Sequence, residues 1–293
     1  MSEAAENPDR GWPESRCSER KLKWTPQRHI CLALVLCLFP GALHSQTADT
    51  LHTERPLFVA GDAVLAGSFI AAAAAAAPLD KWLTRELQDE ARQANRMLRV
   101  GSHVGRVWGF PGTLIAGGGI YLAGMTSGNR RVQDLGLHAA GSVMLSTTIT
   151  YGIKSIAGRA RPHVDTTNAR NFRFFRGIGN DDYQSFPSGH ATAAFAFASV
   201  VTAETSHWWP GGRWPVGMLT YGTATVTAIS RIYNHQHWAS DVLTGAAIGT
   251  LTGLKLFRYQ HSHPDNRIDN TLLRAGLQSH GGRWSILIAR VPR

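Results

Sequence analysis

Cysteine is nearly absent from this chain. Of 293 residues only three are cysteine, Cys17, Cys31 and Cys37, and all three lie near the N-terminus. The rest of the chain therefore has no disulfide, no thiolate nucleophile and no cysteine-based metal site. Charged residues are also scarce, at 17% of the chain against 43% hydrophobic residues. This balance excludes an intrinsically disordered chain and favours helices that pack closely or lie in lipid.

The net charge of +10 is compatible with nucleic acid, an anionic membrane surface or an anionic substrate as the partner. The sequence has no long stripe of lysine and arginine with interleaved aromatic residues. Basic residues concentrate instead between Lys154 and Arg176. A local anion site explains that concentration better than a nucleic-acid-binding face, so we expect no nucleic acid partner.

The first 45 residues are typical of an export signal. Four basic residues between Arg20 and Arg28 precede an apolar run from Ile30 to Phe39, and small residues follow. We expect cleavage near Ser45, and an uncleaved N-terminal anchor is the alternative because the basic segment is long. Residues 46–56 are polar and are expected to form a linker.

Apolar stretches predict an all-α fold, a helical bundle of about six core helices over residues 57–260. The run from Leu57 to Ala77 carries one charge, Asp62, and is long enough to span a bilayer. Residues from Leu79 to Leu98 repeat at helical spacing, which predicts one amphipathic helix at an interface. Five more helices are expected at 110–125, 135–153, 191–203, 216–229 and 242–257. The mean hydropathy of −0.15 leaves both transmembrane helices and a soluble bundle open.

Residues 261–293 are expected to form a separate C-terminal tail. Within it, 271–277 and 284–291 flank Gly281-Gly282, which predicts a short β-hairpin. For Asp62 we expect a cap or an ion pair inside the bundle, and a functional intramembrane acid is the alternative.

Three clusters of chemically active residues stand where an apolar helix meets a loop. The first, Lys154 to Pro162, reads K-x6-R-P. The second, Pro187 to His190, reads P-S-G-H, and the third, Ser230 to Asp241, reads S-R-x5-H-x3-D. Each combines residues that bind an anion with residues that transfer a proton or attack.

The second cluster suits an oxyanion because a helix start offers free backbone N–H groups. Gly189 lets that backbone come close, and the Ser188 hydroxyl can donate as well. His190 can pass a proton to a leaving oxygen.

In the third cluster, His237 and Asp241 are four residues apart, so they share one helix face if the helix has begun at His237. A carboxylate on one imidazole nitrogen fixes the tautomer and leaves the other nitrogen free to attack. Lys154, Arg161 and Arg231 would neutralise a bound phosphoryl group.

Taken together, in this order and spacing, the clusters resemble the signature of the type 2 phosphatidic acid phosphatase and haloperoxidase superfamily. The resemblance covers residues 154–241 and implies that superfamily's helical domain. It implies that His237 is the nucleophile that becomes phosphorylated, that Asp241 orients it and that His190 is the general acid. The implied phosphate-binding residues are Lys154, Arg161, Ser188, Gly189 and Arg231. It implies neither a metal nor a cofactor.

The expected function is hydrolysis of a phosphate monoester or diphosphate through a phosphohistidine, with a phosphorylated lipid as the favoured substrate. We expect the chain in the cell membrane or periplasm, with an extracytoplasmic active site. One alternative is a vanadate-dependent haloperoxidase, although the resemblance implies longer chains for that class. The other is a non-catalytic anion-binding membrane protein, which would not need His190, His237 or Asp241.

Several neighbouring residues carry weaker predictions. His235 forms an H-x-H with His237, but a metal site there is disfavoured and its role is open. The aromatic side chains of Phe172, Phe174, Phe175 and Tyr183 form either a lip for a lipid or ordinary loop packing. Four arginines between the first two clusters are expected to attract anionic substrates or to be solvated charges: Arg159, Arg170, Arg173 and Arg176.

Overall fold

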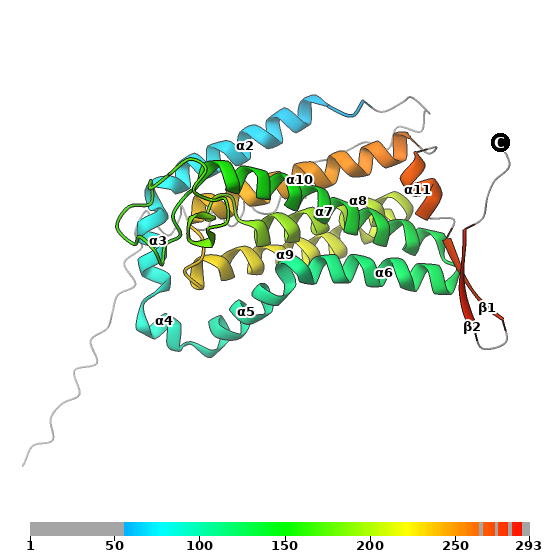
Figure 1. Cartoon of the computed structure of the whole chain (residues 1–293), viewed down its shortest axis with the longest axis horizontal. Helices are drawn as coiled ribbons and strands as arrows, with labels where there is room; N and C mark the ends of the chain where they lie inside the picture. Colours follow the sequence, from blue (N-terminus) through cyan, green and yellow to red (C-terminus); the bar gives the residue numbers. More distant parts are fainter. Residues whose placement is uncertain (1–55, 264–265, 273–274, 281–282, 289–293) are drawn as a thin grey trace, which may run out of the picture.

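The computed structural model describes residues 56–263, 266–272, 275–280 and 283–288. The predicted export signal, its cleavage point near Ser45 and all but the last residue of the predicted linker lie outside these residues. The body of the described chain is a bundle of long, roughly aligned helices (Figure 1). In chain order the main helices are α2 (Ala60–Ala76), α3 (Asp80–Leu87), α4 (Glu90–Ala94), α5 (Arg96–Val107), α6 (Thr113–Ser127), α7 (Arg130–Ala157), α8 (Gly189–Trp208), α9 (Arg213–Tyr233), α10 (Ala239–Ser262) and α11 (Arg267–Leu272). The predicted all-α bundle is confirmed.

The predicted single helix over 79–98 is wrong, because two side chains interrupt it. Asp89 accepts a hydrogen bond from the Ala91 N–H at 3.1 Å and so begins α4. Asn95 accepts from the N–H groups of Met97 at 2.9 Å and Leu98 at 3.2 Å and begins α5. Short polar side chains such as those of Asp and Asn favour helix caps over helix interiors. The helical periodicity of the sequence continues across both caps, so it does not reveal where the helix breaks.

Helix α8 lies at the centre of the bundle and packs against α7, α9 and α10. Its apolar side chains, such as Phe195 and Val200, are fully buried. Glycines let α10 approach α8 closely: a Cβ at Gly249 would lie 2.2 Å from the Thr192 carbonyl oxygen. This contact brings the N-terminal ends of α8 and α10 together, and the second and third sequence clusters are at those ends.

Helix α2 lies along the outside of the bundle against α10 (Figure 1). Its Asp62 accepts from the Val59 N–H at 2.8 Å and pairs with Arg258 at 2.7 Å and with Lys255 of α10. The expectation that Asp62 caps and pairs inside the bundle is therefore confirmed. Within the described part of the chain, Ala60–Leu87 is the one helical stretch long and apolar enough to cross a membrane.

Beyond α11 two strands, β1 (Ala275–His280) and β2 (Arg283–Ile288), pair antiparallel with Ala275 opposite Ile288. They lie at the end of the bundle opposite to α3 and α4 (Figure 1). The α7–α8 loop and the α9–α10 turn lie at the end of the bundle next to α3 (Figure 1). The three sequence clusters are within or directly beside these two segments.

Candidate active site

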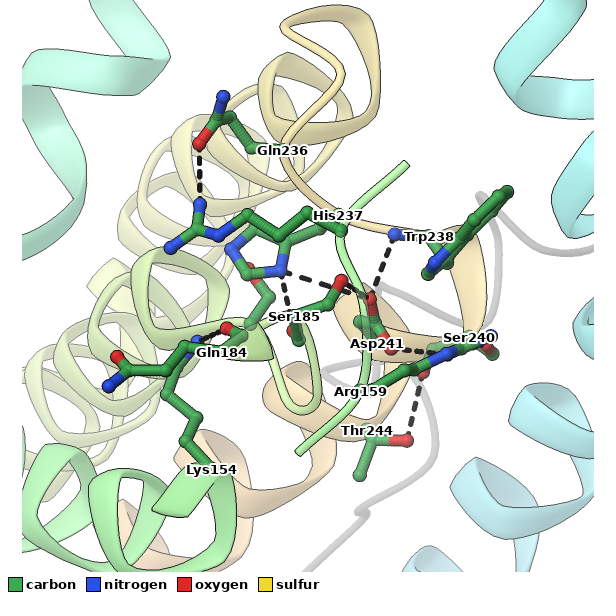
Figure 2. A network of polar contacts seen from close by, with 12 residues as sticks. Lys154, Arg159, Gln184, Ser185, Gln236, His237, Trp238, Ser240, Asp241 and Thr244 are labelled. Atoms are coloured by element: carbon green, nitrogen blue, oxygen red, sulfur yellow. Dashed lines mark hydrogen bonds and ion pairs between the residues drawn. The ribbon is translucent and has the colours of Figure 1, made fainter. Parts of the chain in front are cut away.

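His237 lies in the short turn before α10, and its side chain is 2% exposed. Its Nδ1 is 2.6 Å from the carbonyl oxygen of Ser185, whereas the Asp241 Oδ2 is 3.8 Å from the same nitrogen (Figure 2). A carbonyl oxygen only accepts, so Nδ1 carries the proton and Nε2 keeps its lone pair. Burial, together with the nearby Lys154 ammonium, holds the pKa of His237 well below its usual value although Asp241 opposes the shift. The imidazole is therefore neutral and has a free nitrogen.

The condition for placing His237 and Asp241 on one helix face, that the helix has begun at His237, is not met. Helix α10 begins at Ala239, so His237 precedes the helix instead of sharing a face with Asp241. Asp241 instead accepts from the Trp238 N–H at 2.9 Å and from the Ser185 hydroxyl at 2.6 Å. At 3.8 Å Asp241 acts on the ring through its charge, and the direct hydrogen bond that fixes the tautomer goes to the Ser185 carbonyl.

Asp241 is fully buried, and burial by itself would raise its pKa. The Arg159 guanidinium, with His237 and Ser185, outweighs that cost and lowers the pKa of Asp241 to about 2. The carboxylate is therefore ionised over the whole physiological range, as an electrostatic partner of His237 must be.

Arg159 is the residue whose role the sequence did not predict. It is buried, not a surface charge, and its Nη1 donates to Asp241 and to the Ser240 hydroxyl at 2.8 Å. Its Nη2 lies 2.8 Å from Asp80, which also accepts from the Ser240 N–H at 2.9 Å. A guanidinium thus links two buried carboxylates, and one of them comes from α3, far away in the sequence. The earlier expectation that Arg159 attracts substrate or is solvated is wrong.

The three predicted cations converge on this end of the bundle. Lys154, in the last turn of α7, donates to the Gln184 carbonyl (Figure 2). Arg161 donates to Gln236 and Asp181. Burial and then the nearby Arg161 lower the pKa of Lys154 to about 7. Arg231, near the end of α9, is buried and its Nε has no hydrogen-bond partner among the described residues.

The P-S-G-H cluster forms the start of α8. The backbone N–H of Ser188 donates to the Asp241 carbonyl at 3.0 Å, which joins the second and third clusters. The Ser188 hydroxyl is buried and has no partner within the described chain. A Cβ on Gly189 would meet Lys154 Cε at 3.7 Å, so the α8 start directly faces the lysine.

His190 follows in the first turn of α8 and rests on the backbone of Gly109. A Cβ at Gly109 would come within 2.3 Å of the His190 ring, so the absence of a side chain there makes room for the imidazole. Burial, and then the Arg231, Lys154 and Arg161 charges, lower the pKa of His190 to about 3. No signal in the sequence had connected Gly109 with this histidine.

Buried polar groups are nearly always hydrogen-bonded, so the unpaired Ser188 hydroxyl and Arg231 Nε are unusual. Both are donors, and both belong to residues beside the same group of cations. A tetrahedral anion would supply the missing acceptors. This set can therefore bind a phosphoryl group next to a neutral imidazole.

The remaining predicted residues take other positions. His235 has a positive φ of 59°, and its carbonyl oxygen lies 3.2 Å from His163 Nδ1. Phe174 and Phe175 are 73% and 63% exposed on the α7–α8 loop, and Arg176 stacks on Tyr183 with its guanidinium 4.8 Å from the ring centroid.

With this geometry established, comparison with known proteins becomes informative. Residues 135–264 match the model of the PAP2 superfamily. Over these residues the chain is similar to the PAP2 superfamily. The match includes all three sequence clusters and ends before the C-terminal strands, and the resemblance predicted from the motifs is confirmed.

Two individual relatives match over shorter stretches. The lipid A 1-phosphatase of Porphyromonas gingivalis is 49% identical over 70 residues, which are 24% of this chain and 15% of that protein. Lipid phosphate phosphatase gamma of Arabidopsis thaliana is 29% identical over 120 residues, 39% of this chain and 49% of the relative. The chain thus matches less than half the length of these two relatives. A PAP2-type phosphatidylglycerolphosphate phosphatase from Bacillus subtilis superposes with a TM-score of 0.47 and 22% identity, over 70% of this chain and 98% of that one.

Proposed function

We propose that this PAP2-like domain is a metal-independent phosphatase that hydrolyses a lipid phosphate monoester or diphosphate through a phosphohistidine at His237. The observation that carries the proposal is a buried, neutral imidazole whose Nδ1 donates to a carbonyl oxygen, close to three cations. Two donors there, the Ser188 hydroxyl and Arg231 Nε, have no acceptor among the described residues. Phosphoryl transfer requires mainly positioning and charge stabilisation, which these residues supply.

In the first step, His237 Nε2 attacks phosphorus and the bond to the ester oxygen breaks. Lys154, Arg161 and Arg231 balance the charge on the phosphoryl oxygens, and the Ser188 hydroxyl and the Gly189 N–H donate to them. His190 gives a proton to the leaving oxygen. In the second step His190 takes a proton from water, which attacks the phosphohistidine and releases phosphate.

His190 can act as an acid only if it gains a proton when the substrate binds. Part of the lowering of its pKa comes from Arg231, Lys154 and Arg161. A bound phosphate neutralises these cations, so it raises the pKa of His190 and favours the protonated ring. Substrate binding therefore protonates the general acid that the reaction needs.

A lipid substrate and a location at the membrane are supported by the surface around the site. Phe174, Phe175 and Ile178 of the α7–α8 loop are exposed, as are Met97 and Val104 of the amphipathic helix α5. The stretch Ala60–Leu87 is a candidate membrane span on the same chain. The similar proteins named above are phosphatases of lipid A and of lipid phosphates. We propose that the site opens toward a lipid surface, and its extracytoplasmic side stays a prediction.

The test is phosphate release from a panel of lipid phosphates, lipid diphosphates and soluble esters in detergent, with a chelator present. We expect activity with a lipid substrate that survives chelation, is inhibited by vanadate and is lost in His237→Ala. His235→Ala is the matched control and keeps its activity. Chelator-sensitive hydrolysis, or an active His237→Ala protein, contradicts the mechanism, and halide oxidation with added vanadate and peroxide would favour a haloperoxidase.

A further inference from the structure

A second group of titratable side chains lies at the other end of the same helices. His138 is near the start of α7, Glu204 near the end of α8 and His261 near the end of α10. His138 and Lys154 are on one helix, sixteen residues apart, so at 1.5 Å per residue the two groups are about 24 Å apart along the bundle. The proposed phosphatase mechanism uses none of these residues.

Glu204 is the centre of this group. Its Oε1 contacts His138 Nδ1 and lies 3.0 Å from His261 Nε2, and the carboxylate is buried. One ligand atom from each of the three residues can be chosen so that all lie within 4.8 Å of one another. Two imidazoles and one carboxylate are a ligand set that zinc commonly takes in proteins, with a fourth position left for water.

The other nitrogen of His138 gives an independent indication. His138 Nε2 lies 3.3 Å from the Asp269 carboxylate of α11. Histidines that bind a metal usually pair their second ring nitrogen with a carboxylate or carbonyl, which fixes the ring orientation and makes the ligand more basic. Asp269 already occupies this position beside His138.

Two further oxygens remain without partners. Oδ1 of Asp269 and Oδ1 of Asp134 are buried and make no hydrogen bond to any described residue. A cavity of about 460 Å³ lies beside Asp134 but is not lined by Asp269; its lining residues are Arg131, Asp134, Glu204, His207, Trp208 and His261. An ordinary ion-pair network explains the contacts between His138 and Glu204, but it explains neither the unpaired carboxylate oxygens nor the space beside Glu204 and His261.

We propose that His138 Nδ1, Glu204 and His261 Nε2 bind a zinc ion, with Asp269 orienting His138 and a water from the cavity in the fourth position. A tetrahedral site with Zn–N bonds of about 2.0–2.1 Å places its ligand atoms about 3.3 Å apart, so small side-chain movements suffice. Binding displaces the proton that His138 shares with Glu204. The ion ties α7, α8 and α10 together far from the phosphoryl group, so it stabilises the fold and takes no part in hydrolysis.

The test uses the full chain in detergent, stripped with a chelator, dialysed and titrated with zinc chloride. Metal content after gel filtration and the Tm are the readouts. We expect the wild-type chain to retain about one zinc more than His261→Ala and Glu204→Gln, and its Tm to rise with zinc while theirs does not. His263→Ala, two residues along the chain at the end of α10, is the matched control and behaves as wild type.

Zinc bound elsewhere on the chain, such as at the N-terminal cysteines, contributes equally to wild type and variants. The difference in zinc content between them therefore counts only the proposed site. His261 is at the edge of the group, with its side chain 32% exposed, so His261→Ala is expected to fold, and its helical circular dichroism checks this. Phosphate release should be the same for wild type and His261→Ala. Equal zinc content in wild type, His261→Ala and Glu204→Gln, or no zinc in wild type, overturns the proposal.

Discussion

The two ends of the bundle place buried imidazoles in opposite electrostatic surroundings. At the phosphate-binding end, burial and neighbouring cations hold the pKa of His237 well below its usual value. At the far end burial opposes protonation, but Asp269 and Glu204 outweigh it and raise the pKa of His138 to about 9. The same kind of side chain is thus a neutral imidazole at one end, where we propose it as the nucleophile, and a cation at the other, where we propose it as a metal ligand. What decides its chemistry is which charges the helix ends bring beside it.

Loss of His190 should give the largest change at the cationic end. In His190→Ala we expect kcat for a lipid phosphate to fall by about 10²–10⁴-fold, the usual contribution of a general acid. With an ester whose leaving group is already acidic, such as a nitrophenol, the loss should be much smaller because no proton is needed. Parallel steady-state assays of both esters measure this, and equal losses would remove His190 from the acid role.

Arg159 connects the cationic end to the fold. In Arg159→Met the carboxylates of Asp80 and Asp241 lose their shared partner, and an unpaired buried charge costs about 3–5 kcal/mol of unfolding free energy. Denaturant titration measures the change. Arg170→Met, on the exposed part of the same loop, is the control and should stay within about 0.5 kcal/mol. Similar stability of the two variants would mean that Arg159 is not the link described.

The pH dependence of kcat/KM should reveal the contribution of the Lys154 ammonium to phosphate binding. Because the pKa of Lys154 is about 7, the ammonium is lost and phosphate binding weakens as the pH rises through that value. Protonation of His237 does not limit the mildly acidic side, since its pKa is lowered. Because His190 must also gain a proton when the substrate binds, kcat/KM falls with rising pH on both sides of pH 7, and loss of the Lys154 ammonium should make it fall more steeply above that value. Lys154→Arg keeps its charge and should lose the extra steepness, whereas a steeper fall that persists assigns the titration to another group.

The smallest expected effect concerns the exposed aromatic side chains near the site. Phe174→Ser with Phe175→Ser should raise the apparent KM for substrate in vesicles by about tenfold, since each phenyl ring contributes about 1.5–3 kcal/mol if it is fully buried in lipid and less at an interface. The KM for a short soluble ester should not change. If both KM values rise equally, these side chains shape the site itself and do not contact lipid.

The grouping of residues at the proposed active site could be predicted from the sequence because they occur in short, ordered clusters. The helix ends bring together residues that the sequence places beside them: Lys154, Arg161, Arg231 and the P-S-G-H turn. Residues whose partners are distant were missed. Arg159 reads as one more loop arginine until α3 brings Asp80 beside it, and His138 has no motif linking it to Glu204 or His261.

The helical stretches were also predictable from their periodicity, but the break at Asn95 was not. Capping depends on a single side-chain bond that periodicity does not register. The Ser185 carbonyl contact to His237 was likewise hidden, because any residue supplies a carbonyl and only the fold determines where it points. The domain bounds 57–260 and the catalytic roles remain predictions.

The stereochemical course at phosphorus tests the central claim most directly. Hydrolysis of an ester with an isotopically chiral phosphoryl group, in labelled water, reports whether transfer is direct or passes through the enzyme, even if no intermediate accumulates. A phosphohistidine requires two in-line displacements, so the account predicts overall retention of configuration. Inversion would mean that water attacks the substrate directly, and His237 would then not be the nucleophile.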